Sequence, residues 1–80
     1  MRDKKYRSND AVSSYMRDVM KRKGITQDDM ARASGRAQSY IAKHLMEHST
    51  WKIDDIEAIA PLFGYPNALS LMSAAFDYKN

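Results

Sequence analysis

The sequence predicts an all-α domain, compact and built from five helices. Apolar residues recur at three- and four-residue spacing in five segments, and capping residues, glycines or prolines separate these segments. The 80 residues are enough for a single small hydrophobic core. The chain has no cysteine, so the fold depends on packing rather than on disulfides. We expect one domain at 9–76, between a flexible basic arm at 1–8 and a tail at 77–80.

The first helix is expected from about residue 10 to residue 23, with Asn9 as its cap. Gly24 ends it, and the three basic residues just before Gly24 suit the negative end of the helix dipole. Its apolar stripe follows the spacing of one helix face and consists of Val12, Tyr15, Met16, Val19 and Met20.

The second and third helices are separated by a tight turn. Thr26 can cap the second helix, and Asp29, three residues later, can complete a capping box. Gly35 supplies the positive φ that a sharp helix end needs. The third helix is expected at about 37–46. It turns polar and basic side chains outward, and its core face carries Ile41, His44 and Leu45.

The fourth helix starts after Trp51, which we expect to fill the core at its entry. Pro61 lies inside the helical pattern, so the helix should kink or tighten there, and Gly64 should close it. The expected core face consists of Ile53, Ile56, Ile59, Ala60 and Phe63.

The last helix, expected at about 68–75, has apolar residues on more than one side. One helix of so short a chain rarely buries its whole circumference within a monomer, so this surface favours a partner subunit. The alternative is that both sides pack on the first and fourth helices. The possible dimer contacts are Leu69, Leu71, Met72 and Phe76.

Charge is distributed unevenly along the chain, although the net charge is only +3. Residues 1–52 hold 12 Lys or Arg against six Asp or Glu, whereas residues 53–80 hold one against four. The basic half contains the two helices around Gly35, and this coincidence favours a phosphate-binding surface. A soluble surface with a chance asymmetry is the alternative.

Residues 10–72 resemble the Cro/CI-type (XRE) helix-turn-helix family of phage repressors and bacterial regulators. The resemblance rests on the order and spacing of four fragments: TQDDMA at 26–31, Gly35, QSYI at 38–41 and IDDIEAIAPLFG at 53–64. Two of the departures from the family pattern lie just before the third helix and at its end. Arg36 replaces a residue that is usually apolar, and Met46-Glu47 replaces a usual Asn-Gly turn.

The resemblance implies a lambda-repressor-like fold that binds an operator in duplex DNA, as a homodimer at least on DNA. The third helix would lie in the major groove. A glutamine amide can bond adenine in two places, and a lysine favours guanine acceptors. The expected base-reading residues are Gln38, Ser39, Lys43 and Arg36, the last of which could instead contact a phosphate. The expected phosphate contacts are Gln27, Tyr40, Thr50 and Lys52. The basic residues of the arm could also reach the minor groove, or could form a solvated terminus.

Other function classes fit the sequence less well. The same fold could serve as a protein-interaction module, such as an antirepressor or a toxin-binding antitoxin. His44 to His48 match H-x-x-E-H, a zinc-peptidase signature, but a catalytic site would need a third ligand and a substrate cleft. We therefore expect no enzyme, cofactor, metal or small-molecule ligand. The sequence has neither an apolar run of bilayer length nor a signal-peptide core, so we expect a cytoplasmic protein without membrane contact.

Overall fold

A computed structural model describes residues 8–46 and 50–78 of the chain. Over these residues it contains five α-helices, a short 3-10 helix and no strand, which confirms the predicted all-α fold. In chain order the elements are α1 (Ser8–Lys23), α2 (Gln27–Ser34), α3 (Gln38–Met46), α4 (Ile53–Ile59), η1 (Ala60–Phe63) and α5 (Ala68–Tyr78).

Two helix ends differ from the sequence prediction. Helix α1 begins at Ser8, so Asn9 lies inside the helix and is not its cap. The remainder of the expected arm, residues 1–7, lies outside the described residues. Helix α5 continues to Tyr78, into the stretch expected as a tail. Tyr78 places its ring edge against Tyr15 of α1, with centroids 5.2 Å apart. This contact gives the last turn of α5 a reason to stay helical.

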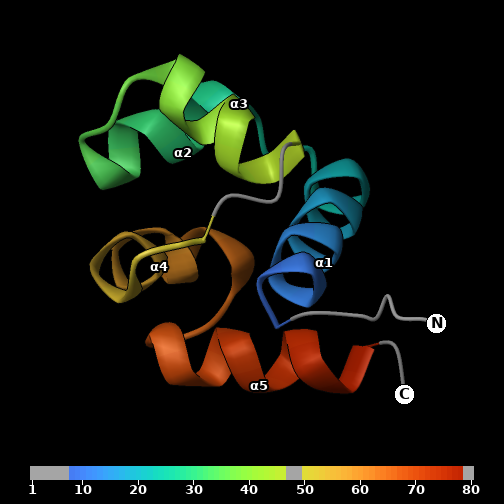
Figure 1. Cartoon of the computed structure of the whole chain (residues 1–80). Coiled ribbons are helices and arrows are strands. Elements are labelled where there is room, and N and C mark those ends of the chain that lie inside the picture. Colours follow the sequence, from blue (N-terminus) through green and yellow to red (C-terminus); the bar gives the residue numbers. More distant parts are fainter. Residues whose placement is uncertain (1–7, 47–49, 79–80) are drawn as a thin grey trace, which may run out of the picture.

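The helices form two groups around one core (Figure 1). Helices α2 and α3 lie together at one end of the molecule, and α5 runs along the other end, packed against α1 and α4. Helix α1 also contacts α3, and α4 also contacts α2, so these two helices join the ends. The surface of α2 and α3 is thereby kept away from α5.

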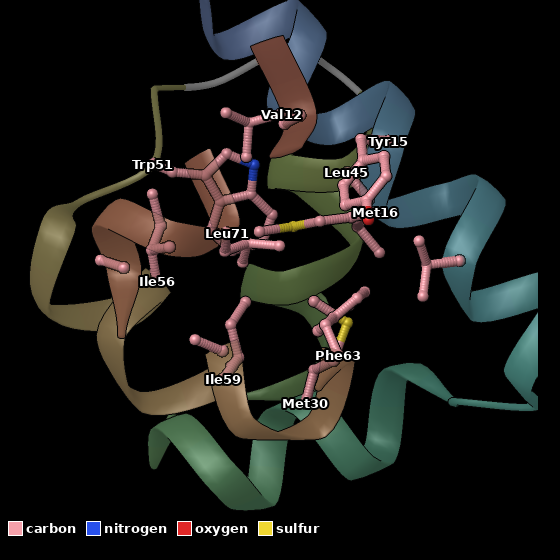
Figure 2. Packing of buried hydrophobic residues seen from close by; sticks show 14 of the residues in the cluster. Val12, Tyr15, Met16, Met30, Leu45, Trp51, Ile56, Ile59, Phe63 and Leu71 are labelled. Atoms are coloured by element: carbon pink, nitrogen blue, oxygen red, sulfur yellow. The ribbon is translucent and has the colours of Figure 1, made fainter. Parts of the chain in front are cut away.

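The core draws at least one buried side chain from every helix (Figure 2). Met16 and Phe63 lie at its centre and are almost completely buried. Trp51 fills the space in front of α4 as predicted, and its Nε1 donates to the Ser13 hydroxyl over 2.9 Å. The other large side chains with almost no exposure are Met30, Ile41, Leu45, Ile56, Ile59, Leu71 and Val19.

The segment around Pro61 tightens as predicted. Helix α4 ends at Ile59, and η1 takes over with Pro61 in its first turn, where a missing N–H costs least. Gly64 then closes the segment at φ 89°.

Ile53 corrects the predicted core face of α4, because its side chain is 56% exposed. The inward face of α4 is centred on Asp55, Ile56 and Ile59, which leaves Ile53 at its border. The buried face of α4 therefore includes a carboxylate, that of Asp55, which the apolar pattern did not predict.

Candidate nucleic-acid interface

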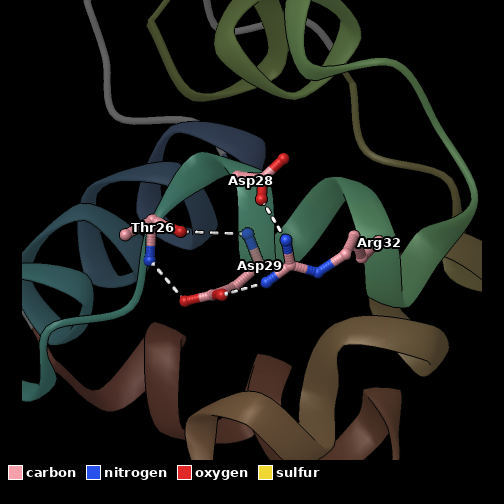
Figure 3. Close-up of polar contacts among 4 residues, drawn as sticks. All are labelled: Thr26, Asp28, Asp29 and Arg32. Atoms are coloured by element: carbon pink, nitrogen blue, oxygen red, sulfur yellow. Dashed lines mark hydrogen bonds and ion pairs between the residues drawn. The ribbon is translucent and has the colours of Figure 1, made fainter.

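The N-terminus of α2 is fixed by a complete capping box (Figure 3). The Asp29 backbone N–H donates to Thr26 Oγ1 over 3.0 Å, and the Thr26 backbone N–H donates to the Asp29 carboxylate over 2.9 Å. The bond from the Thr26 backbone is the main reason why the pKa of Asp29 lies below its ordinary value. Both bonds were predicted from the sequence spacing, and they set where α2 begins.

Arg32 neutralises the acidic first turn of α2. Its guanidinium donates to Asp28 and, over 2.9 Å, to Asp29, one turn back along the same helix (Figure 3). The Arg32 and Asp28 side chains are exposed and that of Asp29 is partly exposed, so these pairs add little to stability. Their effect is that Arg32 does not add free positive charge to this surface.

The turn between α2 and α3 has the predicted form. Gly35 adopts φ 73°, and its N–H donates to the Ala31 carbonyl over 2.9 Å. Helix α3 starts three residues later, and the Ala37 carbonyl accepts from the N–H groups of Tyr40 and Ile41. A side chain at position 35 would be strained in this left-handed conformation.

Helix α3 divides into a buried and an exposed face. Ile41, His44 and Leu45 are buried, as predicted. Three of the four predicted base-reading residues are on the exposed face: Gln38, Ser39 and Lys43. Met46, at the end of the helix, is also 60% exposed.

Helix α1 holds the C-terminal end of α3. The Ser13 hydroxyl donates to the His44 carbonyl over 2.9 Å, and the Arg17 guanidinium donates to the Leu45 carbonyl. The last carbonyls of an α-helix have no partner within the helix, so these bonds satisfy groups that burial would otherwise penalise. They also join the exposed face of α3 rigidly to the core.

His44 has a structural place. Its Nδ1 lies 2.9 Å from the Tyr40 carbonyl, and its ring stacks on the ring of Tyr40 and contacts the tilted ring of Trp51. The other two residues of the H-x-x-E-H pattern, Glu47 and His48, lie outside the described residues. Among the residues that are described, no group of three or more His, Cys, Asp or Glu could hold a metal ion.

The predicted phosphate contacts occupy the edges of the α3 surface. Gln27 is the first residue of α2 and is half-buried. Thr50 and Lys52 are exposed in the segment before α4, and Lys52 is the residue that precedes its first turn. Both helix starts have two acidic residues in the first turn, Asp28 and Asp29 in α2 and Asp54 and Asp55 in α4, so attraction of a phosphate would depend on side chains, above all on the exposed Lys52.

Arg36 and Tyr40 meet at a buried carboxylate that the sequence did not reveal as functional. Asp55 is 3% exposed. Its Oδ1 accepts from Arg36 Nε over 2.9 Å and its Oδ2 accepts from Tyr40 Oη over 2.6 Å. The Arg36 guanidinium also lies 4.7 Å above the centre of the Tyr40 ring. We call these three residues the Asp55 cluster; it binds the turn before α3 and the first turn of α3 to α4.

The Asp55 cluster shifts the pKa of each member. Burial opposes ionisation of Asp55, but the hydrogen bonds from Tyr40 and Arg36 outweigh it, so the pKa of Asp55 lies below its ordinary value. The bond to the carboxylate raises the pKa of Tyr40 and also that of Arg36. All three shifts favour the hydrogen-bonded, charged form of the cluster at neutral pH.

Three of the four predicted dimer contacts reach the surface, and the fourth is buried. Leu69 is 74% exposed, Phe76 is 39% exposed and Met72 is half-buried. Leu71 corrects the prediction, since it is fully buried in the core between α5 and its neighbours and has no surface to offer a partner. The apolar surface of α5 therefore runs along Leu69, Met72 and Phe76, which have i, i+3, i+7 spacing.

No protein-family model, curated protein or solved structure shows a significant match to this chain. None of the described helices is both long and apolar enough to cross a bilayer. Any assignment of function therefore rests on the geometry of α2, α3 and their surroundings.

Proposed function

We propose that this protein is a sequence-specific regulator that binds duplex DNA, of the Cro or immunity-repressor kind. The observation that carries the proposal is the exposed face of α3. Gln38, Ser39 and Lys43 share it, while the opposite face and both ends of the helix are held by the core. A rigid helix with short polar and basic side chains on its outer face suits the width of the major groove.

The neighbouring residues support contacts with the DNA backbone. Lys52 is an exposed cation just before α4, Thr50 is exposed two residues earlier, and Gln27 lies at the start of α2. Contacts of this kind fix the register of a protein on the duplex, whereas the outer face of α3 would supply the sequence preference. Arg36 has one edge of its guanidinium on Asp55, which leaves the remaining N–H groups for a phosphate or a base.

A homodimer on DNA fits the exposed apolar surface of α5. Leu69, Met72 and Phe76 lie at the end of the molecule remote from α2 and α3, so pairing through them would leave both recognition helices accessible. Two-fold symmetry would then require half-sites about one helical turn, roughly 34 Å, apart.

Selection of bound sites from a random duplex library tests this function directly. The proposal expects enrichment of a two-fold symmetric site, with binding that weakens steeply as salt increases, because phosphate contacts release counterions. Sedimentation of the protein with the selected duplex should show two chains on each site. A library that yields no enriched sequence would reject the DNA-reading function.

A protein-interaction module is the second candidate, and the exposure of Leu69 favours it. An antirepressor or antitoxin would use the surface of α5 for a partner other than itself. Leu69→Asp separates the two uses in one experiment. For a DNA-binding dimer, this change should lower both dimerisation and site affinity. For an interaction module, the change should leave self-association as it is in the wild type, because α5 would contact a different protein.

A further inference from the structure

We propose that Asp55 is a positioning residue for DNA recognition, an inference that rests on the proposed function. Its buried carboxylate holds Arg36 and Tyr40, and these two residues flank Gln38 and Ser39 in the sequence. Asp55 thereby sets the orientation of the first turn of α3, without touching DNA itself.

The three side chains of the Asp55 cluster all contact one another. One carboxylate oxygen binds Arg36, the other binds Tyr40, and the guanidinium of Arg36 covers the Tyr40 ring. Each side chain is thus fixed by the other two. Both hydrogen bonds involve an ionised group, which makes them stronger and more directional than bonds between neutral partners.

Stability alone is a poor explanation for this arrangement. The Asp55 side chain is 5% exposed and the Arg36 side chain is 38% exposed, so the carboxylate loses nearly all its hydration for a partner that stays partly in water. What the pair adds is a defined distance and angle between α4 and the turn that precedes α3. A base-reading side chain needs such definition, because its productive geometry tolerates only about 0.5 Å and 10–20° of error.

The two ends of α3 are consequently anchored to different helices. Ser13 and Arg17 of α1 bind the carbonyls at its C-terminal end, whereas Asp55 of α4 binds the side chains at its N-terminal end. Removing the bond at the N-terminal end would leave α3 free to turn about the other end. Gln38, in the first turn, would then be displaced most.

Asp55→Asn tests the inference, with Asp54→Asn as the matched control. Both changes remove one negative charge from the first turn of α4, but Asp54 is exposed. A general electrostatic effect would strengthen DNA binding in both variants. We expect Asp54→Asn to bind the selected site as well as the wild type does. Asp55→Asn should lose about tenfold in its preference for that site over random duplex. An equal preference in the two variants would overturn the inference.

Amide hydrogen exchange gives a readout that does not involve DNA. Exchange at Tyr40 and Ile41, whose N–H groups donate to the Ala37 carbonyl, should be faster in Asp55→Asn than in Asp54→Asn, while exchange at Leu45, near the end held by α1, should change less. Uniform acceleration along α3 would mean a purely structural role and would refute positioning. If Asp55→Asn does not fold, Arg36→Lys replaces it in the exchange measurement, which does not depend on any contact of Arg36 with DNA; the change keeps the charge but loses the planar donor that Asp55 binds.

The two proposals fail in different ways. If the wild type enriches no DNA site, the proposed function is rejected, and the exchange pattern still reports whether Asp55 orients α3. If the wild type reads a site and Asp55→Asn reads it equally well, only the positioning role is rejected.

Discussion

At the scale of single residues, the exposed side chains of α3 can be replaced with little effect on stability, whereas the buried ones cannot. Gln38, Ser39 and Lys43 are exposed, whereas Ile41 and Leu45 are in the core. Changes on the outer face should therefore alter binding at almost constant stability, because surface substitutions usually shift the free energy of unfolding by less than about 0.5 kcal/mol.

Gln38→Ala should weaken binding to the selected site by about 1–3 kcal/mol and relax the preference at one base pair. The reason is the loss of an amide that can donate to and accept from one base edge. Competition titrations with single-base variants of the site would measure the effect. Equal losses on specific and random duplex would assign Gln38 to the backbone instead.

Lys52→Ala should weaken binding to all sequences to a similar extent. Lys52 is exposed at the start of α4, where its charge would meet a phosphate rather than a base. The slope of log K against log salt should become shallower by about 0.9, the value for one phosphate contact. An unchanged slope would show that Lys52 lies outside the contact surface.

The contrast between Asp55 and Thr26 shows what a sequence can predict at this scale. The capping partner of Thr26 is only three residues away, so helix spacing alone identified it. The partners of Asp55 are 15 and 19 residues away, on elements whose packing no local pattern specifies. An acidic residue in the first turn of a helix is already explained by the helix dipole, so its burial gave no signal. The unusual arginine after Gly35 was the one sign of the Arg36–Asp55 pair in the sequence.

At the scale of elements, the capping box gives α2 a defined start, which a helix of eight residues needs. Thr26→Ala should lower the free energy of unfolding by about 1 kcal/mol and the Tm by about 4–8 °C. Thermal denaturation followed by circular dichroism measures both. Thr50→Ala makes the same chemical change at an exposed position outside the helices and should leave the Tm nearly unchanged. Equal shifts in the two variants would contradict the capping role.

The sequence predicted where the helices end better than it predicted which of their faces are buried. Gly35 and Pro61 each impose a local backbone constraint, and both segments took the predicted form. The inward face of α5 was ambiguous, because Leu69 and Leu71 both belong to apolar stripes. The positions of α1 and α4 decide between them, and they bury Leu71 while leaving Leu69 exposed. Such a choice depends on tertiary packing and not on periodicity.

At the scale of the whole molecule, the low pKa of Asp55 links folding to pH. The unfolded chain binds a proton at this carboxyl near pH 3.9, whereas the folded chain does so only at lower pH. Its contribution to stability is therefore complete above about pH 5 and is lost as the pH falls through the folded-state pKa. Urea denaturation between pH 7 and pH 3 should show this loss.

Tyr40→Phe should make the free energy of unfolding less sensitive to acid. It removes one of the two hydrogen bonds that lower the pKa of Asp55, so this pKa rises towards its ordinary value and less stability is lost in acid. The curves of the variant and the wild type should converge as the pH falls. Parallel curves would mean that Tyr40 does not influence the ionisation of Asp55.

The side chains that α3 exposes take no part in the bonds that anchor its two ends. The bonds from Ser13, Arg17 and Asp55 end on carbonyls and on Arg36 and Tyr40, and none of them uses Gln38, Ser39 or Lys43. Descendants of this chain could thus exchange those three side chains while inheriting an unaltered scaffold. Under the proposed function, such exchanges would change the preferred operator, and few mutations would be enough to start a new regulatory circuit.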